Sequence, residues 1–204
     1  MTPSAMLKGL ECRVVELSSR LVGHCIPVDH GYALYAAISR HVPEIHDARE
    51  IGVQPIRGIY GGDGLLYMAP FSRLTLRLPD DQLRDYLKLA GKTLDVKGYP
   101  LRIGVPEARM LLPIASLRSR LVTIKGFLDK GPFLDAADRQ LQSMGIRGEV
   151  LLGERRTFRV KDKQVVGFEV AITGLTAEES LTLQEKGLGG RRRMGCGIFV
   201  PWRG

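Results

Sequence analysis

Segments with the two-residue period of β-strands alternate along this chain with segments whose apolar residues recur every three or four positions. In the first half, turn residues such as the GGDG sequence separate these segments. The elements predicted there, in chain order, are a strand over Leu10–Leu21, a helix over Tyr32–Ile45, strands over Ile56–Tyr60 and Leu65–Met68, a strand over Leu74–Leu78, a helix over Gln82–Ala90 and a strand or hairpin over Leu94–Val105. The order is β-α-β-β-α-β.

The second half repeats that order, with a helix ended by Gly145 and a polar KDKQ turn between two strands. Its predicted elements are a strand over Met110–Ile124, a helix over Phe133–Met144, strands over Val150–Val160 and Gln164–Ile172, a helix over Thr176–Glu185 and a strand over Ile198–Trp202. In a ferredoxin-like unit of this order, two helices cover one face of a four-stranded antiparallel sheet. We therefore expect an α+β protein of two tandem ferredoxin-like units, residues 1–105 and 106–204.

Basic residues outnumber acidic ones, and the excess lies mainly in the second half. The 204 residues include 30 Lys and Arg against 22 Asp and Glu, which gives a net charge of +8 and a pI of about 9.6. Residues 1–105 carry 13 basic and 11 acidic side chains, a balance of 13 − 11 = +2, whereas residues 106–204 carry 17 and 11, a balance of +6. A polyanion such as nucleic acid is the first partner that this charge suggests.

The cysteines and the N-terminal segment bear on the cellular compartment. Cys12, Cys25 and Cys196 are odd in number and far apart, so they predict neither a disulfide framework nor a zinc knuckle. No segment has the apolar length of a membrane helix, and residues 1–17 lack the pattern of a signal peptide. We therefore expect a cytoplasmic protein that does not bind to membranes.

A glycine-rich segment with three consecutive arginines, GLGGRRRMGCG, lies between the last predicted helix and the last strand. Glycines let backbone N–H groups approach a ligand, and guanidinium groups match phosphate oxygens. The segment precedes a strand rather than opening a helix, so it is neither a P-loop nor a dinucleotide fingerprint, and no nucleotide cofactor is expected. A flexible loop with a solvated run of charge is the alternative. The candidate phosphate-binding residues are Gly187, Gly189, Gly190, Arg191, Arg192, Arg193, Gly195 and Gly197.

All four histidines, His24, His30, His41 and His46, lie near the first predicted helix, beside Tyr32 and Tyr35. Their spacing is not that of a metal site, and no acidic nuclease cluster is present, so metal-independent chemistry is expected. RNA carries its own nucleophile, and a histidine that removes the 2′-hydroxyl proton suffices for strand cleavage. A surface, capping or core role is the alternative for each histidine, and packing is the alternative for each tyrosine.

The tandem units, the GLGGRRRMGCG segment followed by IFVPW, and the VDHGYALYAAISRHVPEIH segment resemble the Cas-six family of CRISPR repeat-processing endoribonucleases, in the RAMP superfamily. The resemblance implies metal-independent cleavage of precursor RNA at the base of a repeat stem-loop. The protein then retains or releases the mature guide RNA, and other Cas subunits are further candidate partners. The resemblance also implies a catalytic histidine in or just after the first helix. We rank His41 first, because it lies late in the predicted helix at its groove-facing edge, then His46 and His30, with Tyr35 as a candidate partner. The resemblance further implies a basic groove for the RNA hairpin, for which the candidates are Arg118, Arg120, Arg139, Arg155 and Arg156.

Two other functions remain open at this stage. One is a non-catalytic RNA-binding subunit of a CRISPR ribonucleoprotein complex, built on the same fold. The other is a metabolite-binding ferredoxin-like regulatory module, which has no need of the positive charge on the second half. Binding that depends steeply on salt and leaves the RNA intact identifies the RNA-binding subunit.

Overall fold

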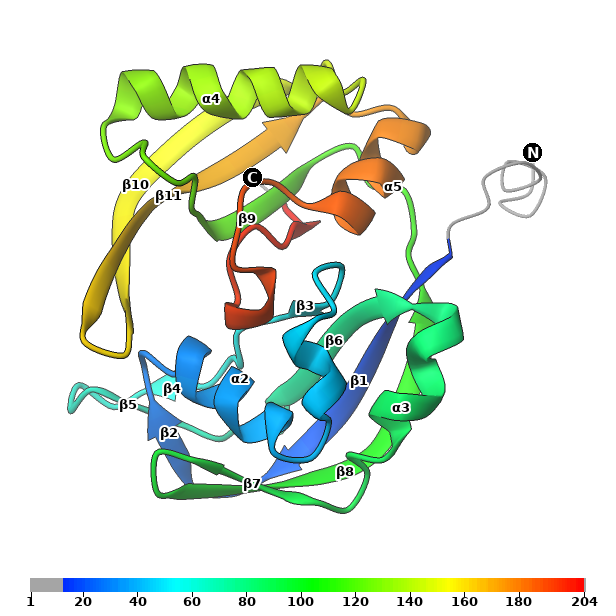
Figure 1. Ribbon diagram of the computed structural model, residues 1–204, viewed down its shortest axis with the longest axis vertical. Helices are drawn as coiled ribbons and strands as arrows, with labels where there is room; N and C mark the ends of the chain where they lie inside the picture. Colours follow the sequence, from blue (N-terminus) through cyan, green and yellow to red (C-terminus); the bar gives the residue numbers. More distant parts are fainter. Residues whose placement is uncertain (1–12, 204) are drawn as a thin grey trace.

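The computed structural model describes residues 13–203, which form two larger sheets and a smaller third one (Figure 1). The first half comprises β1 (Val14–Val22), β2 (Cys25–Pro27), α2 (Gly31–Ser39), the 3₁₀ turn η1 (Pro43–His46), β3 (Gly52–Val53), β4 (Ile59–Tyr60), β5 (Leu65–Tyr67), β6 (Arg73–Pro79), the 3₁₀ turn η2 (Asp80–Gln82), α3 (Leu83–Leu87), β7 (Thr93–Val96) and β8 (Tyr99–Met110). The second half comprises β9 (Leu117–Val122), α4 (Lys130–Ser143), β10 (Glu149–Val160), β11 (Lys163–Thr173), α5 (Ala177–Lys186), the 3₁₀ turn η3 (Arg192–Met194) and β12 (Val200–Pro201).

The strand order confirms the predicted fold class. The first sheet has the order β3-β6-β1-β8-β7 and the second the order β10-β11-β9-β12, and all pairs between neighbouring strands are antiparallel. In the first sheet β6 lies between β3 and β1, and in the second β11 lies between β10 and β9. In each case the third strand of the β-α-β-β-α-β unit lies between the first two, which is the split βαβ arrangement. The β7 strand is an additional edge of the first sheet. The predicted hairpin at GGDG forms as β4 and β5, but these strands pair with β2 in a separate three-stranded sheet.

Several element boundaries differ from the expectations. The predicted helix over Tyr32–Ile45 is wrong in its length, because α2 ends at Ser39 and Pro43 opens the separate turn η1. The residue before a proline avoids the helical region, and Val42 accordingly has φ −133° and ψ 79°. The strand β8 continues through residue 105 to Met110 while paired with β1, so the expected division after residue 105 falls inside a strand. Residues 10–12 of the first predicted strand lie outside the described residues.

Each unit has its own hydrophobic core. In the first, Leu34 and Ile38 of α2 pack with Leu76 and Leu101 of the sheet. In the second, α4 buries Phe133 against Phe168 of β11, with ring centroids 4.7 Å apart. In Figure 1, α4 lies above β10 and β11, and the segment between α5 and β12 runs toward α2. The helices therefore leave the other face of the second sheet open toward the first unit.

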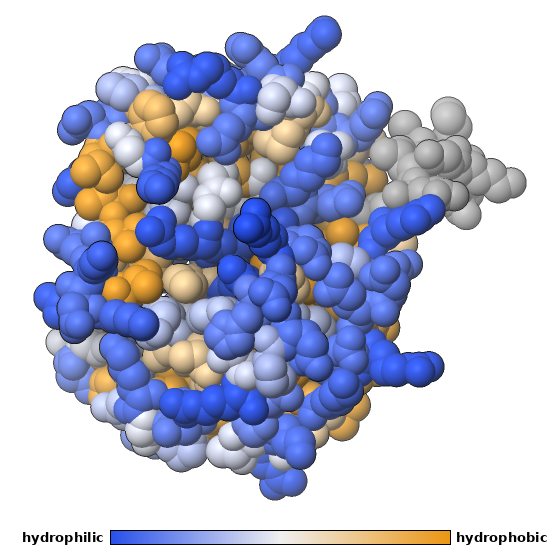
Figure 2. Space-filling model, viewed as in Figure 1, coloured by the Kyte–Doolittle hydropathy of each residue, from blue (hydrophilic) through white to orange (hydrophobic). Residues whose placement is uncertain are grey.

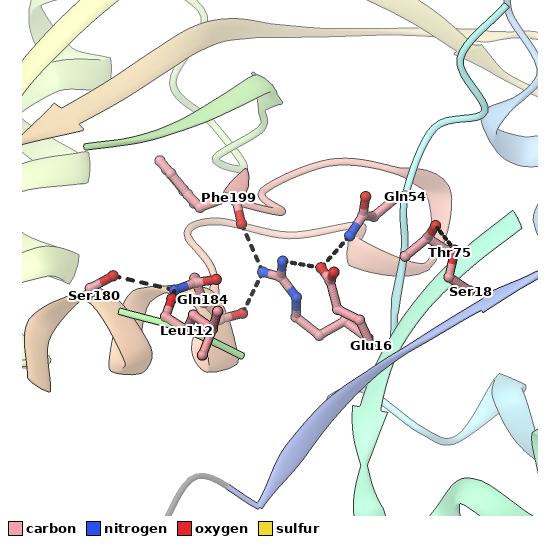
Figure 3. A network of polar contacts seen from close by, with 9 residues as sticks. Glu16, Ser18, Gln54, Thr75, Leu112, Ser180, Gln184 and Phe199 are labelled. Atoms are coloured by element: carbon pink, nitrogen blue, oxygen red, sulfur yellow. Dashed lines mark hydrogen bonds and ion pairs between the residues drawn. The ribbon is translucent and has the colours of Figure 1, made fainter. Parts of the chain in front are cut away.

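A buried arginine joins the two units. Arg77 of β6 is 0% exposed, and its Nη1 donates to the carbonyl oxygens of Gln184 and Phe199 in the second unit, both at 2.8 Å. Its Nη2 donates to the Glu16 carboxylate at 2.5 Å, and Gln54 donates to that same carboxylate. In Figure 3, Glu16 and Gln54 lie on one side of this network and Gln184 and Phe199 on the other. The network fixes the end of α5 and the start of β12, which flank the glycine-rich segment, against the first sheet.

On the face shown in Figure 2, hydrophilic side chains predominate, and apolar surface is visible mainly over β10 and β11 below α4. Among the helices of residues 13–203, none combines the length and apolar character that a bilayer span requires.

Candidate functional site

The structure brings His46 and Tyr35 together. The Tyr35 hydroxyl lies 2.6 Å from Nδ1 of His46, and the two rings meet edge to face with centroids 5.5 Å apart. Tyr35 is largely buried on α2, whereas His46 is exposed at the end of η1. This geometry arises because the chain turns back at Pro43, which places the end of η1 beside the preceding helix. With Nδ1 engaged, Nε2 is the ring nitrogen that makes no hydrogen bond within residues 13–203 and that is available for proton transfer.

Arg193 of the glycine-rich segment reaches the same place from the second unit. Its Nη1 donates to the carbonyl oxygen of Ile45 at 2.6 Å and also to the carbonyl oxygen of His46. Its guanidinium carbon lies 5.6 Å from the centroid of the Tyr35 ring, within the range of a cation–π contact. One candidate phosphate-binding arginine is thus in contact with both members of the His46–Tyr35 pair.

The glycine-rich segment is tightly packed rather than free in solution. A side chain at Gly189 would collide with the carbonyl oxygen of Thr123, and one at Gly197 with that of Leu188, and both glycines have positive φ. Gly190 donates to Thr123 at 2.8 Å, which fixes the loop to the end of β9. The alternative of a flexible loop is therefore wrong, since these glycines allow close approach between backbone segments of the protein itself.

The expected use of the loop's backbone N–H groups for phosphate is wrong for most of them. The N–H groups of Gly187, Leu188, Gly189, Gly190, Met194, Gly195, Cys196 and Gly197 donate to acceptors within the protein. Arg192 also departs from its expected role, because it is 8% exposed and lies too deep to bind RNA. Burial lowers the pKa of Arg192 to about 10, with a further contribution from the charge of Arg77, so the guanidinium remains protonated at neutral pH. Arg191 is exposed at the surface.

Three of the candidate arginines line the cavities beside this loop. Arg118 and Arg120 lie two positions apart on β9, so both side chains project from the open face of the second sheet. They line a groove of about 620 Å³ between the two units, and Arg120 also lines a smaller cavity of about 100 Å³ with Arg156 of β10. Gly195 lines both cavities. The glycine-rich segment therefore contacts both the His46–Tyr35 pair, through Arg193, and the arginine-lined surface, through Gly195.

Charge at this surface is only partly compensated. Glu169 accepts from Arg118 at 2.5 Å and from Arg156 at 2.9 Å. Burial alone would raise the pKa of Glu169, but these hydrogen bonds and charges lower it on balance, so the carboxylate stays ionised. Desolvation and the nearby Arg156 lower the pKa of Arg120. One carboxylate thus faces two arginines directly, while Arg120 has no ion-pair partner within residues 13–203, which leaves positive charge for a polyanion.

The other two candidate arginines lie elsewhere. Arg139 is exposed on α4, which covers the face of the second sheet opposite to Arg118 and Arg120, and its guanidinium contacts the Phe127 ring at 6.0 Å. Arg155 is opposite the buried Phe168 in the β10–β11 pair and is itself exposed. The structure therefore does not bring Arg139 and Arg155 to the groove with the other three.

His30 is a structural residue. It is 2% exposed, its Nδ1 lies 3.0 Å from the carbonyl oxygen of Pro27, and its Nε2 accepts from the backbone N–H of Ile56 at 3.0 Å. These two contacts define a neutral ring protonated at Nδ1. Burial lowers the pKa of His30, which keeps the ring neutral. Because both nitrogens are used to hold backbone segments, His30 has no nitrogen left for a substrate.

His41, ranked first from the sequence, lies outside this arrangement. The ranking assumed a helix that continues to Ile45, but α2 ends at Ser39 and His41 follows it as an exposed residue. Within residues 13–203 its ring has no hydrogen-bond, ionic or ring partner. His24 is also exposed, and its ring contacts Tyr67 edge to face at 5.4 Å. Of the four histidines, His46 is the one that combines an exposed side chain with a hydrogen bond from its ring to another side chain.

Three further groove residues were not among the candidates. Arg57, Tyr60 and Trp202 line the 620 Å³ groove together with Arg118 and Arg120. Tyr60 and Trp202 were expected only as ends of predicted strands, and Arg57 was not among the candidate arginines. The signal available was the position of Arg57 just before the GGDG hairpin, but the approach of that hairpin to the second unit is a tertiary contact. Among the described residues, no group of three or more His, Cys, Asp or Glu side chains is arranged to hold a metal ion.

Comparison with known proteins identifies the family. Residues 15–204 match the family model described as Cas6 Crispr. The CRISPR-associated endonuclease Cas6 of Myxococcus xanthus (strain DK1622) is 40% identical over 187 residues, which are 92% of this chain and 81% of the relative.

Solved structures agree with the fold. A Cas6-related protein from Pyrococcus furiosus superimposes with a TM-score of 0.65 at 14% identity, over 92% of this chain and 98% of the other. Thermus thermophilus Cse3, bound to an RNA representing a pre-cleavage complex, gives a TM-score of 0.53 at 17% identity, over 92% and 98%. The match to the family model over nearly the whole chain, together with the Myxococcus relative, shows that this chain belongs to the Cas6 family of CRISPR proteins.

Proposed function

We propose that this protein is a metal-independent endoribonuclease that cleaves CRISPR precursor RNA within its repeats and so produces guide RNA. The single observation that carries the proposal is the exposed His46, held by Tyr35 beside the glycine-rich loop. The Myxococcus relative is named an endonuclease, and the Thermus protein of the same fold is bound to RNA. Both support RNA cleavage as the activity.

In this proposal His46 is the general base. Its Nε2 takes the proton from a ribose 2′-hydroxyl, and the 2′-oxygen attacks the adjacent phosphorus. The bond from phosphorus to the 5′-oxygen breaks, and that oxygen takes up a proton as it leaves. The products are a 2′,3′-cyclic phosphate and a 5′-hydroxyl. Tyr35 keeps the imidazole in one orientation through the contact to Nδ1, as a partner residue does for many catalytic histidines.

The RNA is held by the open face of the second sheet. Arg118, Arg120 and Arg156 present positive charge there, and Arg191 adds a further exposed guanidinium on the loop. Guanidinium groups contact phosphate oxygens in any sequence, so these residues supply affinity and orientation. The first unit thus contributes the proposed catalytic histidine and the second contributes most of the phosphate-binding charge.

The test is cleavage of repeat RNA in the presence of EDTA. The proposal expects a single cut whose upstream product ends in a 2′,3′-cyclic phosphate. A 2′-deoxy nucleotide at the cleaved position removes the nucleophile and abolishes the cut, while a 2′-deoxy nucleotide one position downstream leaves it intact. Cleavage that survives the first substitution contradicts the mechanism. RNA that is bound tightly but stays whole supports the alternative of a non-catalytic RNA-binding subunit.

The cytoplasm is the proposed location, and other Cas subunits are proposed further partners. Cys25 and Cys196 are both free and buried, which suits a reducing compartment.

A further inference from the structure

The turn that carries His46 has little support from its own residues. The turn η1 is four residues long, and Val42 at its N-cap provides no side-chain hydrogen bond. The carbonyl groups at the end of such a turn have no partner within it. Those of Ile45 and His46 are the two that Arg193 binds. The position of the His46 backbone therefore depends on a side chain from the second unit, 147 residues away.

Arg193 fixes the partner of His46 as well. Its guanidinium packs on the Tyr35 ring, while the Tyr35 hydroxyl contacts His46 Nδ1 at 2.6 Å. The three side chains therefore form a closed arrangement in which a shift of Arg193 moves both the backbone and the ring partner of the imidazole.

The loop holds Arg193 itself in place. Both of its neighbours in the chain are anchored: Arg192 is buried, and Met194 packs against the core of the first unit. Gly31, at the start of α2, lies so close to the carbonyl oxygen of Met194 that any side chain there would collide with it. Such contacts on both sides leave Arg193 little freedom to move, which suits a supporting role better than that of a mobile phosphate ligand.

We propose that Arg193 is a positioning residue, which holds His46 and Tyr35 in their productive geometry rather than binding RNA phosphate. This proposal rests on the proposed function, in which His46 is the catalytic base. It assigns the three arginines of the loop different roles: Arg191 is available to RNA, Arg192 is packed inside, and Arg193 organises the catalytic pair.

The experiment compares single-turnover cleavage at saturating protein with RNA affinity measured at several salt concentrations. We expect Arg193→Ala to slow cleavage by about 10- to 100-fold, the effect of a misplaced catalytic group. Its RNA affinity should stay within about twofold of the parent protein, with an unchanged salt slope. Arg193→Lys keeps a donor for the two carbonyls and should recover part of the rate. Arg84→Ala, which removes an exposed cation from α3, is the control for loss of one charge.

A double variant separates positioning from independent action. If Arg193 acts through His46, the variant with His46→Ala and Arg193→Ala cleaves no more than about twofold more slowly than His46→Ala alone. If the rate losses of the two single variants multiply in the double variant, the proposal is overturned. So does a weaker affinity of Arg193→Ala with a salt slope reduced by about one, because that is the behaviour of a phosphate ligand.

Two further outcomes are distinguishable. If His46→Ala cleaves normally, the histidine assignment of the proposed function fails, and the role of Arg193 fails with it. If His46→Ala is slow and a folded Arg193→Ala is not, the positioning role alone fails. Should Arg193→Ala not melt cooperatively, Arg193→Gln, whose amide can donate to one carbonyl, replaces it and is expected to show an intermediate rate loss at unchanged affinity.

Discussion

The hydroxyl of Tyr35 lies 2.6 Å from Nδ1 of His46, and the two residues belong to elements that a proline separates. This contact distinguishes His46 from the other histidines, because it orders the ring of an exposed residue through Nδ1 and leaves Nε2 without a hydrogen bond within residues 13–203. The consequences can be measured on single variants.

The first prediction concerns which histidine acts. His46→Ala should slow single-turnover cleavage of repeat RNA by about 10²- to 10⁴-fold, the usual effect of losing a general base. His41→Ala, five residues earlier and also exposed, should cleave within about twofold of the parent protein, and RNA affinity should be preserved in both. A slow His41→Ala together with a normal His46→Ala would reverse the assignment.

The second prediction concerns the phenol of Tyr35. Tyr35→Phe keeps the ring that Arg193 packs on but removes the hydroxyl, so cleavage should slow by about 2- to 10-fold, the equivalent of one hydrogen bond. Tyr32→Phe is the matched control, because Tyr32 lies on the same helix with its ring 6.5 Å from that of Tyr35. Equal rates for the parent protein and Tyr35→Phe would show that the hydroxyl does not orient His46.

The third prediction separates exposed from buried arginines. Arg120→Ala should weaken RNA binding and lower the slope of log affinity against log salt by about one, since one phosphate contact is lost. Arg192→Met should change neither quantity, and its melting temperature should hold or rise, because two nitrogens of this buried guanidinium have no hydrogen-bond partner. Affinity measured at four salt concentrations checks both. A reduced slope for Arg192→Met would mean that the loop opens when RNA binds.

The fourth prediction concerns the link between the units. Glu16→Gln leaves the charge of the fully buried Arg77 without its counterion and should lower the free energy of unfolding by about 3 kcal/mol. Glu107→Gln makes the same chemical change in the exposed pair with Arg109 and should cost about 0–1 kcal/mol. Urea denaturation at neutral pH compares the two variants. Similar losses of unfolding free energy in the two variants would show that the buried charge of Arg77 does not need Glu16 as its counterion.

The fifth prediction concerns pH. Because burial lowers the pKa of His30, the unfolded chain binds a proton at this residue before the folded protein does. The free energy of unfolding should therefore be fully retained above about pH 6.5 and should fall below it, by at most about 1.4 kcal/mol per pH unit, until the lowered pKa is passed. Denaturation curves between pH 5 and 8 measure this slope. His30→Gln should be less stable at pH 8 and should show a flatter decline between pH 6.5 and 5.

The order of elements was predictable because it follows from local patterns. The alternation of Leu74, Leu76 and Leu78 predicts β6, and the Thr176 start predicts α5, whose capping box with Glu179 is present. The end of the first helix was visible in Pro43 but was outweighed by the apolar spacing, which continues through Val42 and Ile45. Both of these residues are buried, so the apolar pattern reports the core and not the helix.

The site was predictable only in part. His46, Tyr35 and Arg193 were all candidates, but the contact of Arg193 with the other two depends on how the two sheets pack, and no local signal specifies that packing. The burial of Arg192 between the exposed Arg191 and the half-buried Arg193 likewise accompanies a left-handed backbone at Arg191, which composition does not reveal. Motifs and charge therefore identified the candidate residues, whereas the tertiary contacts decide which of them lie together.

The interlocking of the halves through Arg193 and Arg77 has an evolutionary consequence. Arg77 of the first half binds acceptors in the second, and Arg193 of the second half binds acceptors in the first. Recombination that exchanges one half for that of a distant relative breaks these contacts unless the incoming half carries an equivalent arginine and equivalent acceptors. The two halves should therefore evolve together, and functional chimeras joined near residue 111 should be rare.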